Sequence, residues 1–164
     1  MRKATITEKG FFFRTPLLPR TSTRRIIIHH TGGADIDASA EQIHQWHLDA
    51  GYAGIGYHFV IRKSGEIERG RPVWAVGAHA YANNYDSLGI HLSGCFTNIQ
   101  PTHYQIESLA LLIANLCEEY KIPIDGKRIL GHREVDLTEC PGNKLFYMLD
   151  DIVGKANWYR WQGE

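Results

Sequence analysis

The sequence lacks an excess of charge of either sign. Its 164 residues contain 18 Lys and Arg and 18 Asp and Glu, so the formal net charge is zero with neutral histidines. Nucleic acids and anionic membrane surfaces attract proteins through clustered positive charge. No apolar run in the sequence is long enough to span a bilayer. We therefore expect no nucleic-acid partner and no insertion into a membrane.

Cysteine is also scarce, with three residues that cannot all pair with one another. Cys117 lies in a helical pattern and is expected in the core. Cys140 is a candidate metal ligand, because a thiolate needs a metal or a positive neighbour to stay deprotonated. The N-terminal segment Met1 to Thr5 carries the charges of Arg2 and Lys3 but is not followed by the apolar segment of a signal peptide. We therefore expect synthesis in the cytoplasm without a signal peptide.

Hydrophobic residues at 43% and charged residues at 22% are typical of a globular domain. We divide the chain into an N-terminal arm, residues 1–24, and one domain, residues 25–164. Apolar runs predict strands at 26–30, 57–62, 66–69, 88–92 and 128–131, the second and third forming a hairpin. Capping boxes predict helices that begin at Ser39 and Thr102, and a last helix covers 143 to about 153 before an aromatic tail at 158–161. This alternation predicts an α/β fold with a central mixed β-sheet flanked by helices.

Two segments far apart in the chain carry potential metal ligands. His29 and His30 end the first apolar run, and His132 and Cys140 stand eight residues apart downstream. Three protein donors with one open position are typical of catalytic zinc. Neighbouring residues of a strand face opposite ways, so only one of His29 and His30 can reach such a site, and the pattern does not select which. A closed structural zinc site is the alternative, with a fourth ligand such as Asp136 or His79.

Further motifs occur between these two segments. They are Ile-Ile-Ile-His at 26–29, Gln-Trp-His at 45–47, Gly-Tyr-His-Phe at 56–59, Gly-Ala-His-Ala at 77–80, Ser-Leu-Gly-Ile at 87–90, Gly-His-Arg-Glu-Val at 131–135 and Cys-Pro-Gly at 140–142. In this order they resemble type-2 N-acetylmuramoyl-L-alanine amidases, the superfamily of phage lysozyme-type amidases and peptidoglycan recognition proteins. The resemblance spans residues 25 to about 145, which is most of the chain.

The resemblance implies a zinc amidase that cleaves the bond between N-acetylmuramic acid and the L-alanine of the stem peptide. It implies one Zn2+ per chain with His29, His132 and Cys140 as ligands, and so selects His29 over His30. Tyr57 and Thr138 fall on positions beside the zinc, with Thr138 where phage enzymes often have lysine. The resemblance also assigns four residues to the substrate groove: Trp46, Trp74, His79 and Asn84.

Peptidoglycan or its muropeptides would be the partner of such a domain. We expect a monomer that acts on the cell wall after release from the cytoplasm, as a phage or prophage endolysin does. The alternative is a module that binds peptidoglycan without cleaving it, and the presence of Cys140 favours catalysis. The general base is left open: Glu134 is either a carboxylate behind the ligands or a surface charge, and His58 is expected to be a core residue.

Overall fold

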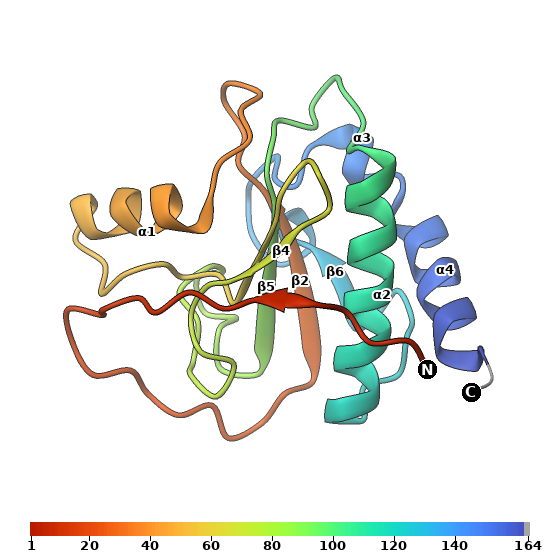
Figure 1. Ribbon diagram of the computed structural model, residues 1–164, viewed down its shortest axis with the longest axis horizontal. Coiled ribbons are helices and arrows are strands. Elements are labelled where there is room, and N and C mark those ends of the chain that lie inside the picture. Colours follow the sequence, from red (N-terminus) through yellow and green to blue (C-terminus); the bar gives the residue numbers. More distant parts are fainter. Residues whose placement is uncertain (163–164) are drawn as a thin grey trace.

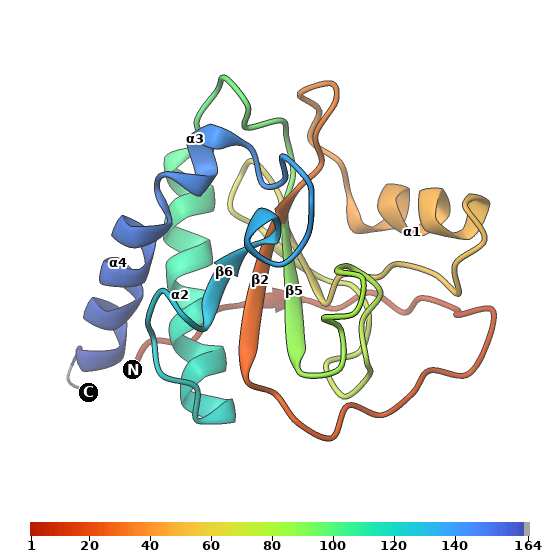
Figure 2. The same ribbon diagram turned by 180° about the vertical axis from the view of Figure 1, so that it is seen from behind.

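A mixed β-sheet of six strands organises the protein, with helices on both faces (Figures 1 and 2). The computed structural model describes residues 1–162. The strands run in the order β1-β4-β3-β5-β2-β6. Their bounds are β1 Ile6–Thr7, β2 Arg25–His30, β3 Phe59–Ile61, β4 Ile67–Arg69, β5 Ser87–Leu92 and β6 Ile129–Gly131. This architecture confirms the predicted α/β fold with a mixed sheet.

Strand β2 lies inside the sheet, with β5 and β6 as parallel neighbours on its two sides. Ile26, Ile27 and Ile28 have no exposed surface, so this strand is buried on both faces. Ile26 and Ile28 belong to the larger core cluster, which includes the buried residues of the helix at 103–120. Because side chains alternate along a strand, His29 shares the opposite face with Ile27.

Helices α1 (Ala40–Asp49) and α2 (His103–Tyr120) begin where the capping boxes predict. The Ser39 hydroxyl accepts a hydrogen bond from the Gln42 amide at 3.1 Å, and Thr102 accepts one from Gln105 at 3.1 Å. Helix α2 packs beside α4 (Leu149–Trp161) on one side of the sheet, and α1 lies on the other side (Figure 1). Among residues 1–162, α1 is therefore the helix that lies on the face carrying His29.

The C-terminal part differs from the prediction of one helix to about residue 153 and an aromatic tail. The structure has a short helix α3 (Asn143–Phe146), and α4 then continues to Trp161. Ile152, Ala156 and Tyr159 recur at helical spacing and are buried in the main core. The prediction of a separate aromatic tail was wrong, because residues 158–161 belong to α4. The exposed Trp158 and Trp161 alternate along the helix with these buried positions.

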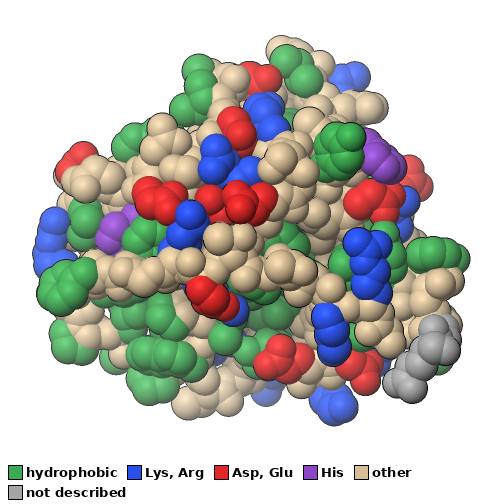
Figure 3. All heavy atoms as spheres, viewed as in Figure 1, with side chains coloured by type: hydrophobic (Ala, Val, Ile, Leu, Met, Phe, Trp, Pro, Cys, Tyr) green, Lys and Arg blue, Asp and Glu red, His purple; other side chains and the backbone are tan. Residues whose placement is uncertain are grey.

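Residues of the predicted arm take part in the sheet. Strand β1 pairs with β4 in parallel, and the Ala4 amide donates to Asn115 of α2 at 2.7 Å. The hairpin prediction is confirmed, because β3 and β4 pair in antiparallel register. Among residues 1–162, no helix is long and apolar enough to cross a membrane. Figure 3 shows acidic and basic side chains interspersed on one face of the molecule.

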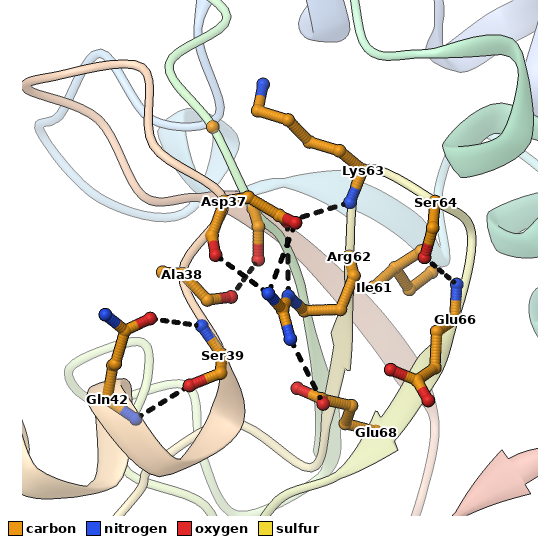
Figure 4. Close-up of polar contacts among 12 residues, drawn as sticks. Asp37, Ala38, Ser39, Gln42, Ile61, Arg62, Lys63, Ser64, Glu66 and Glu68 are labelled. Atoms are coloured by element: carbon orange, nitrogen blue, oxygen red, sulfur yellow. Dashed lines mark hydrogen bonds and ion pairs between the residues drawn. The ribbon is translucent and has the colours of Figure 1, made fainter.

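A buried carboxylate, Glu68, connects α1 to the sheet, and Figure 4 shows its contact with Arg62. Glu68 of β4 is 2% exposed and accepts a hydrogen bond from the Ala40 amide at 2.9 Å, at the first residue of α1. Arg62 donates to Glu68 at 3.3 Å and to Asp37 at 3.1 Å, and Lys9 of the arm lies 3.4 Å from Glu68. A negative charge at a helix N-terminus is favourable. This cluster fixes α1, and the residues it presents, relative to the sheet.

Candidate metal centre

The parallel strands β2, β5 and β6 end at the same edge of the sheet, which is where open α/β sheets bind ligands. Ile28 of β2 pairs with Gly131 of β6. His29 and His132 are the next residues in the two strands' direction, so their side chains meet, with ring centroids 4.6 Å apart. The register of two strands thus brings together residues separated by about a hundred positions in the chain.

Cys140 completes a group of three potential ligands. One ligand atom from each of His29, His132 and Cys140 lies within 4.8 Å of the other two. The Cys140 sulfur is 3.7 Å from Nδ1 of His29. His30 points to the other face, where its Nδ1 accepts from the Phe96 amide at 3.1 Å. The structure therefore assembles the same three residues that the resemblance implies, and we call them the triad.

Backbone contacts hold the loop that presents Cys140. The His30 amide donates to the Cys140 sulfur at 3.4 Å, and the Cys140 amide donates to the Thr138 hydroxyl at 3.2 Å. Gly142 has φ +88°, and a side-chain carbon there would lie 2.5 Å from the Phe96 backbone, so only glycine fits. Glu134 accepts from the Gly131 amide at 2.8 Å and so closes the turn after β6.

The donor set of the triad fits a zinc ion. Burial lowers the pKa of His29 well below its usual value. Burial also lowers the pKa of His132, although the nearby Asp136 acts in the opposite direction. Both rings are therefore neutral. Burial raises the pKa of the Cys140 thiol to about 11, so a thiolate there needs a cation beside it. Nε2 of His132 is buried and makes no hydrogen bond to any described residue. Neutral imidazoles and a thiolate are ligands that zinc accepts.

The two residues considered as a fourth ligand each contact a histidine of the triad instead. Nδ1 of His79 is 2.9 Å from Nε2 of His29. A carboxylate oxygen of Asp136 is 3.3 Å from Nε2 of His132, outside hydrogen-bond geometry. Each therefore contacts a triad histidine and neither joins the group of ligand atoms that the described residues form. This arrangement argues against a closed structural site.

A cavity of about 360 Å³ opens beside the triad, with His132 in its wall. Tyr57 also lines it, and its ring centroid is 5.0 Å from that of His29. Burial, with a smaller contribution from Cys140, raises the pKa of Tyr57 above its usual value, so the side chain is a neutral phenol. A larger cavity of about 450 Å³ lies between Lys3, Phe59 and Leu116, away from the triad. The smaller cavity is the one that adjoins groups able to do chemistry.

A family model described as N-acetylmuramoyl-L-alanine amidase matches residues 19–143. The chain belongs to this amidase family. The endolysin of Escherichia phage T7 is 32% identical over 140 residues, which cover 80% of this chain and 89% of the phage protein. Peptidoglycan-recognition protein SC2 of Drosophila melanogaster is 33% identical over 139 residues, covering 80% and 73%. The solved structure of the endolysine N-acetylmuramoyl-L-alanine amidase LysCS from Clostridium intestinale has a TM-score of 0.85 at 36% identity, covering 95% and 97%.

The groove residues predicted from the amidase resemblance fall into two groups. His79 and Asn84 line the cavity beside the triad. Trp46 lies on α1, 42% exposed and outside the cavity lining. Trp74 is 54% exposed and lines a separate hollow with Phe11 and Phe13 of the arm. Contact of these four residues with substrate stays a prediction.

Other residues in and around this amidase-family site were not predicted from the sequence. Tyr52 and Tyr81 line the cavity and are more than half exposed, and the only sequence signal for Tyr81 is its place after the Gly-Ala-His-Ala motif. Arg71 is 6% exposed and donates to the carbonyls of Ile55 and Val76 at 2.9 and 3.1 Å, so it supports the fold.

Proposed function

We propose that this amidase-family chain hydrolyses the amide bond between N-acetylmuramic acid and the L-alanine of the peptidoglycan stem peptide, with one zinc ion. The observation that carries the proposal is the triad, whose ligand atoms lie within 4.8 Å beside an open cavity. His29, His132 and Cys140 would hold the ion. Bound zinc lowers the pKa of a water molecule to about 7 and polarises a carbonyl group.

Tyr57 and Thr138 are the groups proposed to assist. Because the pKa of Tyr57 is raised, its phenol acts at neutral pH as a hydrogen-bond donor that orients water or the scissile carbonyl, and not as a base. The Thr138 hydroxyl already accepts the Cys140 amide, which leaves its own proton free to donate to the developing oxyanion. The removal of one such donor typically costs about 10²–10³ in rate.

Two candidates for the general base have other contacts. The Glu134 carboxylate accepts the Gly131 amide at 2.8 Å. His58 is fully buried, with one ring nitrogen 3.0 Å from the Gly89 amide and the other 2.9 Å from the Ala75 carbonyl, as expected of a core histidine. These contacts argue against either residue as the base.

Mass spectrometry of defined muropeptides after incubation with the zinc-loaded protein tests the proposal. We expect stem peptides with a free L-alanine amino group. Cys140→Ser should lose both zinc and activity, whereas Cys95→Ser, which alters a cysteine outside the triad, should keep both. A zinc-loaded protein that releases no L-alanine amino groups from muropeptides contradicts the proposal.

A binding module without catalysis is the second candidate, supported by the similarity to Peptidoglycan-recognition protein SC2. Such a module has no activity and keeps its affinity for muropeptides when Cys140 is replaced by serine. The similarity to phage endolysins favours the enzyme, and with it action on the cell wall after release from the cytoplasm. We also propose that the protein is a monomer. Light scattering of the purified protein tests the monomer.

A further inference from the structure

His79 contacts a triad histidine on the side away from the other ligands. We propose that His79 is a positioning residue that fixes the tautomer of His29, so that Nδ1 of His29 stays unprotonated and faces Cys140. The inference rests on the proposed function, because it takes the triad as the metal site. Its evidence is a line of polar contacts that runs from His29 to a backbone carbonyl.

The direction of every hydrogen bond in this line follows from its last member. The carbonyl oxygen of Asn83 can only accept, so the Ser87 hydroxyl, 2.6 Å away, must donate its proton to it. The Ser87 oxygen can then only accept from Nε2 of His79, which lies at 3.4 Å. A neutral His79 with its proton on Nε2 has a bare Nδ1.

The same argument continues to the triad. Nδ1 of His79 is 2.9 Å from Nε2 of His29, so His29 must carry its proton on Nε2 and donate it. Nδ1 of His29 is then unprotonated, and it is this nitrogen that lies 3.7 Å from the Cys140 sulfur. A histidine can bind a metal only through an unprotonated nitrogen, and the partner of its other nitrogen decides which one that is. The line thus leaves His29 ready to bind before any metal arrives.

The ring of His79 sits in a space that two glycines provide. A side-chain carbon at Gly89 of β5 would come within 2.6 Å of the imidazole, and one at Gly77 would come equally close. The Asn84 side chain accepts from the backbone amides of His79 and Ala80, at 3.0 Å each. Both the ring and the backbone of His79 are therefore held in place. A positioning role requires this, whereas contact with substrate alone does not require it.

Nuclear magnetic resonance of the metal-free protein tests the tautomer directly. Long-range ¹H–¹⁵N spectra of the imidazoles, assigned with a His29→Gln variant, should show His29 in wild type protonated on Nε2 alone. In His79→Ala a population protonated on Nδ1 should appear. His79→Asn keeps an acceptor near the position of Nδ1 and should restore the single tautomer. An unchanged His29 tautomer in His79→Ala overturns the inference.

Zinc affinity, measured by competition with a chelator, is the second readout. His79→Ala should weaken zinc binding about 10–100-fold, as expected for loss of a partner of a ligand histidine. His79→Asn should lie closer to wild type, and Tyr81→Ala, which alters the same cavity without contacting the triad, should not change the affinity. A His79→Ala protein that is folded and binds zinc like wild type overturns the inference. A wild-type protein that binds no zinc overturns the proposed function instead, and the tautomer measurement distinguishes the two failures.

Discussion

The buried His58 makes the stability of the protein depend on pH. Its side chain has no exposed surface, Nδ1 accepts from the Gly89 amide at 3.0 Å, and Nε2 donates to the Ala75 carbonyl at 2.9 Å. A proton on Nδ1 would face the Gly89 N–H and remove the hydrogen bond between His58 and Gly89. Burial, together with the nearby Arg20, lowers the pKa of His58 to about 3.

The magnitude follows from the difference between the folded and the unfolded pKa. In the unfolded chain the pKa is about 6.5, so the unfolded state binds the proton first as the pH falls. The contribution of neutral His58 to stability is fully present above that value and is lost towards pH 3. Between pH 7.5 and 5.0 the linkage relation gives a loss of about 2 kcal/mol from this residue.

Urea denaturation of the metal-free protein at pH 7.5 and 5.0 measures this loss. His58→Gln does not titrate, so its free energy of unfolding should fall by about 2 kcal/mol less than that of wild type over the same range. His103→Gln, at an exposed position, is the matched control. Equal pH dependence in wild type and His58→Gln refutes the reasoning. His91→Gln gives a second test at a buried histidine, because burial lowers the pKa of His91 to about 3 as well.

Three more substitutions test other parts of the structure. Gly89→Ala fills the space of the His79 ring and should weaken zinc binding without removing any polar side chain, as chelator competition would show; unchanged affinity contradicts the glycine argument. Tyr57→Phe should lower kcat on muropeptides about 10²-fold and leave zinc content unchanged, and full activity would exclude the phenol from the reaction. Glu68→Gln weakens the contact with the first turn of α1 and removes one of the two acidic partners of Arg62 and of Lys9, so urea denaturation should show a loss of about 1–3 kcal/mol; wild-type stability would contradict it.

Local signals predicted the elements that depend on neighbouring residues. The Ser39 and Thr102 caps marked the starts of α1 and α2, because a capping box is formed within four residues. The apolar run that begins at residue 26 predicted strand β2, which the structure shows to be buried on both faces. The end of α4 was missed because its few buried positions, such as Tyr159, depend on packing against α2, and the helix has no strong apolar stripe of its own.

The candidate site also has a part that the sequence predicted and a part that it did not. The spacing of His132 and Cys140 pointed to a shared ion, and the family motifs selected His29. The contacts of His79 and Asp136 with the triad histidines were not predicted, because each depends on where a ring nitrogen points in the folded protein. The buried position of Arg71 was not predicted for a related reason: its neighbours are backbone carbonyls, which no sequence pattern reveals.

The line of contacts behind His29 has a consequence for the movement of protons. A proton wire needs members that can turn over and pass a proton in either direction, but this line ends at the Asn83 carbonyl, which has no proton to return. The line therefore holds the His29 ring in place but cannot relay a proton away from it. Any proton that the reaction takes up or releases must pass through the open side, where Tyr57 and the cavity meet solvent.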